Sequence, residues 1–204
     1  MNSSAGLQLN PYDPGLWMQQ APEALGATSA AAALYEYILQ VNFPKSAKVL
    51  ELGSGSGVIS ILLALARPEW EITGIELQEE LHRLSQLNAR DLKLPIDFIK
   101  CDLRSYQAPK PYDLIFANPP WQELGKGLLS PNPLRAISRS EVSCSMDDVF
   151  GCITRNLSPQ GQAVLLYPAS RAREAASKAS IANLKLRHPE AQPSQWSILH
   201  FTKG

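Results

Sequence analysis

The stretch Val49-Leu50-Glu51-Leu52-Gly53-Ser54-Gly55-Ser56-Gly57-Val58-Ile59-Ser60 decides the fold of this chain. A short apolar run leads into a glycine-rich turn, and a second apolar run with helical character follows. Glycines allow positive φ and close approach of a ligand to the backbone, and a helix N-terminus supplies free N–H groups. The stretch therefore predicts a strand, a nucleotide-binding loop and a helix.

The spacing of these glycines excludes two common nucleotide sites. A dinucleotide fingerprint has the frame G-x-G-x-x-G, whereas here position 58 is Val and the frame is G-x-G-x-G. A P-loop would continue with Lys followed by Ser or Thr, and no such pair follows.

Acidic residues mark the ends of three successive predicted strands. Glu51 lies in the first, Glu76 follows the strand 71–75, and Asp102 follows the strand 96–100. Ligands bind at the carboxyl ends of parallel strands, and a carboxylate after the second strand can chelate ribose hydroxyls. Each acid taken alone is as well explained as a solvated turn residue or a helix cap. Together with the glycine loop they favour a ligand site.

A fourth predicted strand, Tyr112 to Ala117, runs directly into Asn118-Pro119-Pro120-Trp121. Two consecutive prolines fix φ and donate no backbone hydrogen, so they make a rigid turn. The Asn118 side-chain oxygen and the Pro119 carbonyl can accept hydrogen bonds from an NH₂ group, and Trp121 offers a face for stacking. The turn predicts a pocket for a planar amine; its alternative is a strand-terminating turn with a buried Trp.

In this order the motifs ELGSGSG, GIE, CD and NPPW resemble those of class I S-adenosylmethionine-dependent methyltransferases, over residues 48–167. The resemblance implies an α/β fold: a doubly wound, Rossmann-like, seven-stranded sheet with an antiparallel last strand. It also implies that the glycine loop cradles the methionine part of S-adenosylmethionine above Glu51, that Glu76 holds the ribose, and that Asp102 holds the adenine amine. The cofactor-binding residues that it implies are Glu51, Gly53, Ser54, Gly55, Gly57, Glu76, Leu77, Asp102, Leu103 and Asn118.

In amino-methylating members of this class, the turn after the fourth strand is the catalytic pocket. The resemblance thus implies that Asn118 and Pro119 bind the target NH₂, that Trp121 stacks on its ring, and that Pro120 completes the turn. No general base is expected, because His82, His188 and His200 lie in other segments.

The segment 122–144 after this turn has little helical or strand periodicity, and connections of such length are usually functional. We expect it to recognise the substrate through Lys126, Arg135 and Arg139; the alternative is a solvated surface loop. Its order Gly-x-Gly, Ser-Pro, Arg-Ala and Arg-x-Glu is similar to the bacterial tRNA1(Val) adenine-N6 methyltransferase family. That resemblance implies tRNA as the partner and adenine N6 as the acceptor.

Three alternatives stay open from the sequence. Protein glutamine N5-methyltransferases and rRNA guanine-N2 methyltransferases share the same catalytic turn and cofactor motifs. A non-enzymatic scaffold that binds S-adenosylmethionine is the third alternative, although neither the glycine loop nor the turn is damaged.

The 204 residues, 45% of them hydrophobic, suffice for one sizeable core. We expect an irregular N-terminal arm over 1–27 and a single methyltransferase domain over 28–204. Apolar runs fall far short of the ~20 residues that span a bilayer, and the first basic residue is Lys45, so a cytoplasmic protein without a membrane partner is expected. The cysteines, Cys101, Cys144 and Cys152, lack metal-ligand spacing and are interpreted as reduced thiols with no metal site.

Helix and strand signals alternate along the rest of the chain. Predicted helices cover residues 28–41, 78–91, 145–157 and 170–182, and predicted strands cover residues 162–166, 184–187 and 196–201. The stretch Ser158-Pro159-Gln160-Gly161 separates the third of these helices from the first of these strands. The net charge is zero, but basic residues outnumber acidic ones after residue 154. A phosphate-facing patch of Arg155, Arg171, Arg173, Lys178, Lys185 and Arg187 is one reading of that excess, and scattered solvated charges are the other.

Overall fold

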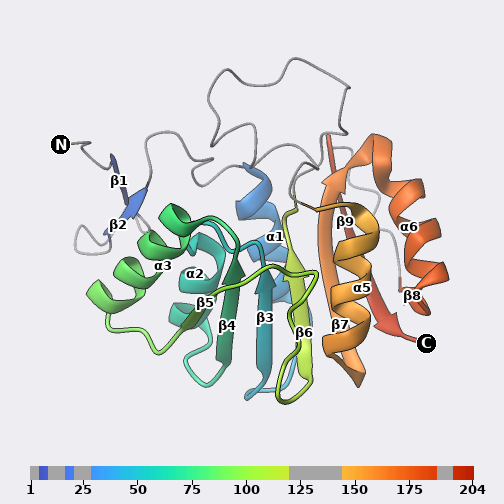
Figure 1. Cartoon of the computed structure of the whole chain (residues 1–204), viewed down its shortest axis with the longest axis horizontal. Coiled ribbons are helices and arrows are strands. Elements are labelled where there is room, and N and C mark those ends of the chain that lie inside the picture. The colour runs from blue at the N-terminus through green and yellow to red at the C-terminus, as the bar shows by residue number, and fades with distance from the viewer. Residues whose placement is uncertain (1–4, 9–16, 21–28, 120–143, 188–194) are drawn as a thin grey trace.

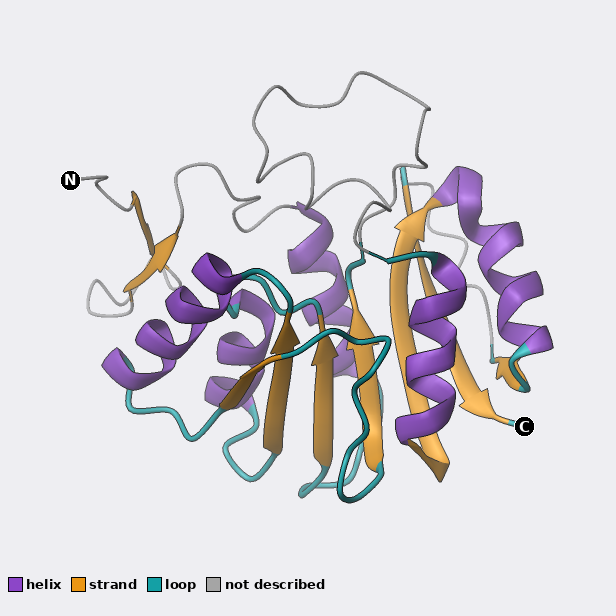
Figure 2. Ribbon diagram, in the orientation of Figure 1, coloured by secondary structure: helices purple, strands orange, loops and turns teal. Residues whose placement is uncertain are grey.

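The computed structural model describes residues 5–8, 17–20, 29–119, 144–187 and 195–204. Its main body is a seven-stranded sheet with helices on both faces (Figures 1 and 2). The strands are β3 (Lys48–Leu52), β4 (Glu71–Glu76), β5 (Asp97–Lys100), β6 (Tyr112–Ala117), β7 (Leu157–Pro168), β8 (Leu184–Leu186) and β9 (Trp196–Lys203). The helices are α1 (Ser29–Gln40), α2 (Val58–Ala66), α3 (Glu79–Asp91), α5 (Met146–Asn156) and α6 (Ala172–Ile181), with a short 3-10 turn η1 (Ala169–Arg171).

The strand order is β5-β4-β3-β6-β7-β9-β8. The ladders that join β5, β4, β3, β6 and β7 are all parallel, whereas β9 runs antiparallel to both β7 and β8. The predicted doubly wound sheet with an antiparallel last strand is therefore confirmed. The order of the strands reverses between β3 and β6, and the crevice at such a point is where open α/β sheets bind ligands.

Alternate residues of each central strand pack on opposite faces of the sheet, as the two-residue period of a strand requires. Leu50 and Ile115 belong to the core that α5 and α6 cover, and Val49 and Leu114 belong to the core that α1 and α2 cover. Both faces are apolar because parallel strands are covered on both sides. This double cover leaves the two edges where strands begin and end as the places for polar chemistry.

The N-terminal arm was predicted to be irregular, and this prediction is wrong for two short segments. Strands β1 (Ala5–Gln8) and β2 (Trp17–Gln20) form a two-stranded antiparallel sheet, with Ala5 opposite Gln20 and Gln8 opposite Trp17. Four-residue strands are too short to show a period in the sequence, and their pairing partner lies outside the segment itself. The helix predicted to follow begins at Ser29, as expected, and ends at Gln40.

The start predicted for the strand 162–166 is also wrong, because β7 already begins at Leu157 and includes Ser158-Pro159-Gln160-Gly161. The pairing of β6 with β7 shifts register there: Tyr112 lies opposite Leu157, but Leu114 lies opposite Gln162. The turn-forming residues are accommodated as an irregularity in a strand rather than as its boundary.

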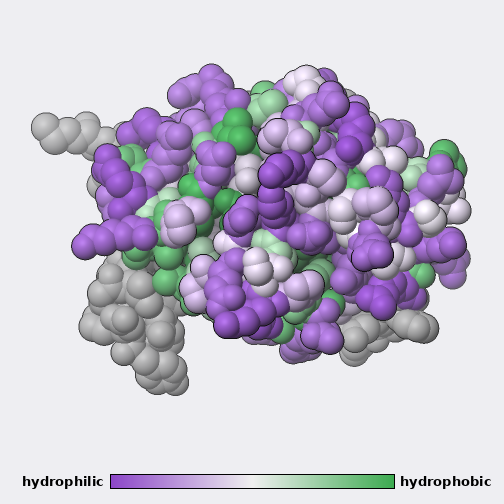
Figure 3. Space-filling model, turned by 90° about the horizontal axis from the view of Figure 1, so that it is seen from below, coloured by the Kyte–Doolittle hydropathy of each residue, from purple (hydrophilic) through white to green (hydrophobic). Residues whose placement is uncertain are grey.

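None of the described helices is long and apolar enough to cross a membrane. Figure 3 shows the molecule from the edge at which the parallel strands begin, where the surface is mostly hydrophilic with scattered hydrophobic residues. The glycine loop and the acidic residues lie at the opposite edge, at the top of Figure 1, where the parallel strands end.

Candidate functional site

The glycine loop joins β3 to α2 with all three of its glycines at positive φ: +68° at Gly53, +56° at Gly55 and +87° at Gly57. The amides of Gly53 and Ser54 both donate to the carbonyl of Ile75, at 2.9 and 3.0 Å, so the loop is closed onto the end of β4. A Cβ at Gly57 would lie 2.7 Å from the Phe98 ring, whereas a Cβ at Gly53 or Gly55 would meet nothing within 4 Å. One side of the loop is thus packed against the protein and the other is open.

Glu51 lies at the base of the loop and is only 3% exposed. One oxygen of its carboxyl group, Oε2, accepts hydrogen bonds from the Ser60 hydroxyl at 2.5 Å and from the Ser60 amide at 3.3 Å. Burial raises the pKa of Glu51 to about 8, against the lowering effect of these two hydrogen bonds. The carboxyl group is therefore largely protonated at neutral pH until a cation lies beside it.

Glu76 ends β4 and is also buried. Its Oε2 accepts a hydrogen bond from the Gly55 amide at 2.9 Å, and its Oε1 accepts one from the Gln78 amide at 2.8 Å. Burial raises the pKa of this carboxyl group as well. Each oxygen keeps a second lone pair, so the fixed carboxylate retains acceptor capacity for hydroxyl groups. Leu77, the next residue, is one of the few large hydrophobic residues that are exposed among the described residues.

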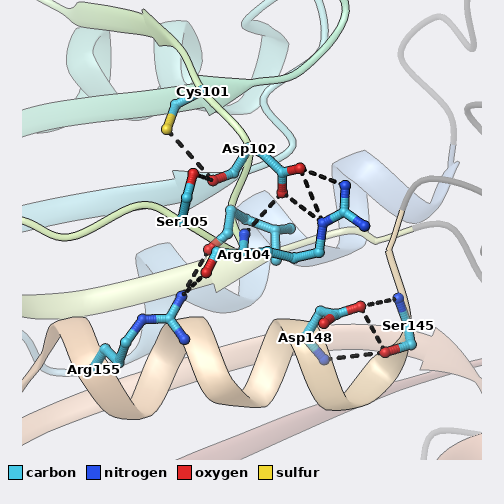
Figure 4. A network of polar contacts seen from close by, with 8 residues as sticks. Cys101, Asp102, Arg104, Ser105, Ser145, Asp148 and Arg155 are labelled. Carbon is cyan, nitrogen blue, oxygen red and sulfur yellow. Dashed lines mark hydrogen bonds and ion pairs between the residues drawn. The ribbon is translucent and has the colours of Figure 1, made fainter.

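Asp102 follows β5 and is held by Arg104, which no motif in the sequence marks. Its carboxylate accepts hydrogen bonds from the backbone amide of Arg104 at 2.9 Å and from the Arg104 guanidinium, which approaches both oxygens (Figure 4). The hydrogen bonds from the Arg104 side chain hold the pKa of Asp102 below its usual range. Arg104 thus already occupies most of the acceptor positions of the Asp102 carboxylate, which was expected to bind an adenine amine.

Helix α5 fixes the loop that carries this pair. The Nη2 atom of Arg155 donates to the carbonyls of Leu103 and Arg104, at 2.9 and 3.0 Å, from a position about fifty residues further along the chain. Figure 4 shows Arg155 reaching from α5 to this loop, with the Ser145–Asp148 cap at the other end of the helix. The sequence placed Arg155 only in a possible phosphate-facing patch, and its contact with this loop comes from the tertiary structure.

Asn118 and Pro119 lie directly after β6, next to β3 and therefore next to the glycine loop. Pro119 is buried and Asn118 is partly buried. The rest of the predicted catalytic and substrate-binding set lies outside the described residues: Pro120, Trp121, Lys126, Arg135 and Arg139. The structure thus brings Glu51, Gly53, Gly55, Glu76 and Asn118 to one edge of the sheet.

The basic C-terminal residues are largely occupied within the fold. Lys178 pairs with Asp147 at 2.6 Å, Arg171 pairs with Glu174 at 2.9 Å, and Arg187 donates to the Gln162 side chain at 3.1 Å. Arg155 is bound to backbone carbonyls, as described above. These contacts favour scattered charges over a phosphate-facing patch.

Within the described part of the chain, no group of three or more His, Cys, Asp or Glu residues could hold a metal ion. The residues at the strand ends do fit a nucleoside-type cofactor. The open sides of Gly53 and Gly55 leave room along the loop, and the buried Glu76 carboxylate is oriented by two backbone amides. A seven-stranded sheet in this order, with a glycine loop after its first strand and acids after the next two, defines the class I methyltransferase fold.

Comparison with known proteins assigns the chain to a family within this class. A family model described as the methyltransferase small domain matches residues 28–129, half of the chain. The chain belongs to this family of S-adenosylmethionine-dependent methyltransferases. A methyltransferase from Pyrococcus furiosus has the same fold, with a TM-score of 0.68 at 17% identity over 92% of this chain and 88% of that one.

Two kinds of curated relative match at similar identity. The tRNA1(Val) (adenine(37)-N6)-methyltransferase of Aeromonas hydrophila is 33% identical over 130 residues, which cover 62% of this chain and 54% of that protein. The release factor glutamine methyltransferase of Streptococcus pneumoniae is 34% identical over 114 residues, which cover 53% of this chain and 40% of that protein. The chain thus spans about half the length of the curated relatives it matches.

Proposed function

We propose that this chain transfers a methyl group from S-adenosylmethionine to an exocyclic amine, and that the acceptor is the N6 amine of adenine in a tRNA. The observation that carries the proposal is the position of Asn118 and Pro119, which directly follow β6 beside β3 and its glycine loop. An amine held by this turn is therefore next to the loop that is open on its outer side.

The residues of this chain have separate tasks in the proposed reaction. When bound, S-adenosylmethionine supplies an electrophilic methyl group. Glu76, fixed by the amides of Gly55 and Gln78, holds hydroxyl groups of a ribose. The carboxyl group of Glu51, bound to Ser60, lies beneath the glycine loop that holds the methionine part. Asn118 and the Pro119 carbonyl accept the hydrogens of the amine and so turn its lone pair toward the glycine loop. Orientation of this kind can supply much of a rate enhancement without a general base.

Adenine in tRNA is favoured over a protein glutamine by the segment after the turn. Its residues Lys126, Arg135 and Arg139 suit contacts to phosphates, and the tRNA1(Val) enzymes align over more of this chain than the release factor enzymes do. A protein glutamine stays the second candidate, because the release factor glutamine methyltransferases match at similar identity.

Methylation of tRNA by purified variants tests the proposal. Asn118→Ala is expected to abolish turnover while the affinity for S-adenosylhomocysteine stays within about twofold, because Asn118 contacts mainly the acceptor amine. Trp121→Ala is expected to raise the KM for tRNA by about tenfold, since stacking of a base on an aromatic ring is worth ~1 to 3 kcal/mol. Trp121→Phe is the matched control and should recover most of the activity. Near-normal methylation of tRNA by Asn118→Ala would contradict the proposed pocket.

A direct comparison of acceptors separates the two candidates. The wild-type protein is supplied with total tRNA or with a release factor, and methyl transfer to each is followed by mass spectrometry. We expect N6-methyladenine in tRNA and no methylglutamine in the release factor; the reverse result would make the protein substrate the correct one.

A further inference from the structure

The N-terminal hairpin of β1 and β2 precedes the part of the chain that matches the family model, which begins at residue 28. Its strand β2 nevertheless packs beside the cofactor loop. Met18 is only 2% exposed and forms one apolar cluster with Val58 and Ile61, which lie in the first turns of α2 directly after the glycine loop. The hairpin is thus anchored on the helix that begins where this loop ends.

Asn88 connects the hairpin to the loop itself. This residue lies in α3 and is 1% exposed. Its side chain pairs with the backbone of Gln19 in both directions: Oδ1 accepts from the Gln19 amide at 2.7 Å, and Nδ2 donates to the Gln19 carbonyl at 2.9 Å. The same Nδ2 donates to the carbonyl of Ser56, in the middle of the glycine loop, at 3.0 Å.

These three bonds make one side chain serve two segments. An amide side chain has two N–H donors, and both donors of Asn88 are used, one on the hairpin and one on the loop. If the hairpin left, the buried Oδ1 and one N–H would lose their partners, and such groups are costly to leave unsatisfied. Asn88 would then reorient toward new partners and release the Ser56 carbonyl.

We propose that the N-terminal hairpin is a positioning element of the cofactor site: docked through Met18 and Asn88, it holds the glycine loop in its binding conformation. Because binding couplings are reciprocal, hairpin docking strengthens S-adenosylmethionine binding, and the bound cofactor in turn stabilises the docked hairpin. The second half of this inference rests on the proposed function of the loop as the cofactor site.

Hydrogen exchange without any ligand tests the hold of the hairpin on the loop. The amides of Gly53, Ser54 and Gly57 donate within the protein, so their exchange reports opening of the loop. Gln19→Pro removes the N–H that Asn88 accepts, and Gln19→Ala keeps that N–H and is the matched control. We expect Gln19→Pro to speed exchange of the three loop amides by about tenfold, roughly one lost hydrogen bond, and Gln19→Ala to leave it within about twofold.

Calorimetric titration with S-adenosylhomocysteine tests the coupling to the cofactor. Gln19→Pro and Met18→Asp are each expected to weaken the affinity for S-adenosylhomocysteine by about tenfold; Met18→Asp does so by placing a charge in the apolar cluster. The main sheet should remain folded in both variants and should still show a thermal unfolding transition. Combining Met18→Asp with Asn88→Ala should weaken affinity by less than the product of the two single effects, because both act through the same docked state. In the wild-type protein, the ligand should slow exchange of the β2 amides.

The outcomes separate this inference from the proposed function. It is overturned if the hairpin amides of Gln19→Pro lose their protection while the loop amides and the affinity stay as in the wild type. A wild-type protein that binds no S-adenosylhomocysteine overturns the proposed function instead. The hydrogen exchange of Gln19→Pro and Gln19→Ala, which needs no ligand, then shows alone whether the hairpin holds the loop.

Discussion

Glu51 has a carboxyl group that the fold removes from water almost completely, at 3% exposure. Its only hydrogen-bond donors among the described residues come from Ser60, and burial outweighs them, so its pKa rises to about 8. In the unfolded chain the same group has an ordinary pKa of 4.5. Between these two values the folded state holds a proton that the unfolded state has released, and stability therefore falls as the pH rises through this range.

Glu51→Gln tests this at the residue scale. The free energy of unfolding, measured in urea, should decrease between about pH 4.5 and about pH 8 in the wild type. The decrease in the variant should be smaller, because the variant lacks the Glu51 carboxyl group. One pKa unit corresponds to ~1.4 kcal/mol, so the difference between the two proteins should reach roughly 3 to 5 kcal/mol across the range. The variant keeps the contribution of Glu76, whose pKa is raised in the same direction. Identical pH slopes in the two proteins would mean that Glu51 is ionised in the folded state.

Glu76 is the second residue whose role can be measured alone. Glu76→Gln keeps one carbonyl oxygen for a backbone amide and removes the negative charge proposed to hold ribose hydroxyls. The loop should stay closed, because the amides of Gly53 and Ser54 still donate to the Ile75 carbonyl. Hydrogen bonds to charged groups are worth ~1.5 to 3 kcal/mol, and we expect the affinity for S-adenosylmethionine to fall by about tenfold or more. An unchanged affinity in calorimetry would remove Glu76 from the cofactor site.

At the scale of elements, helix α5 connects the core to the cofactor edge. Its start is fixed by a capping box in which the Ser145 side chain accepts from the Asp148 amide at 3.2 Å and Asp148 accepts from the Ser145 amide at 2.8 Å. Near its end, Arg155 binds the carbonyls of Leu103 and Arg104. Asp148, at the start of α5, also interacts electrostatically with Arg104, so both ends of the helix act on the Asp102 loop.

Ser145→Ala is expected to destabilise the protein by about 1 kcal/mol, the usual cost of losing an N-cap side chain. Ser180→Ala, at an exposed position of α6 with no capping role, is the matched control and should cost nothing measurable. Urea denaturation of the two variants measures the difference. Equal midpoints would show that the cap makes no net contribution to α5.

At the scale of the whole molecule, the net charge is zero, and Arg155, Arg171 and Lys178 make contacts within the fold. These contacts give no strong field for a polyanion on that side of the described fold. Substrate binding is instead expected in the segment after β6. The two regions differ in what their cations contact. Lys178 already has Asp147 as its partner, whereas Arg135 and Arg139 follow the proposed catalytic turn in the sequence.

Paired substitutions decide between these regions. Arg135→Ala and Arg139→Ala should each raise the KM for tRNA by about tenfold, as loss of a charge-assisted contact does, with the affinity for S-adenosylhomocysteine unchanged. Lys178→Ala should change the KM by less than about twofold. A larger effect of Lys178→Ala than of either arginine would move the tRNA surface to α6.

The sequence alone determined the order of the elements from α1 onward and which side chains stand at the strand ends. Glycines at fixed spacing, acids after successive apolar runs and the Asn-Pro-Pro-Trp turn are local signals, because each depends on backbone freedom or side-chain type within a few residues. For that reason the strands at Glu71–Glu76 and Tyr112–Ala117 and the α3 region were predicted correctly, whereas the antiparallel direction of the last strand was implied by the resemblance to class I methyltransferases.

The tertiary structure alone decided which residues hold the site in place. Asn88, Arg104 and Arg155 act on backbone groups or carboxylates of other segments, and their partners are set by packing rather than by local pattern. The same holds for β2, which packs against α2 and α3. It also holds for Ser158-Pro159-Gln160-Gly161, which lies within β7 between Leu157 and Gln162, two residues that pair with β6. Contacts between segments far apart in the chain leave no periodic signal in either segment, since each side is satisfied only when both are folded.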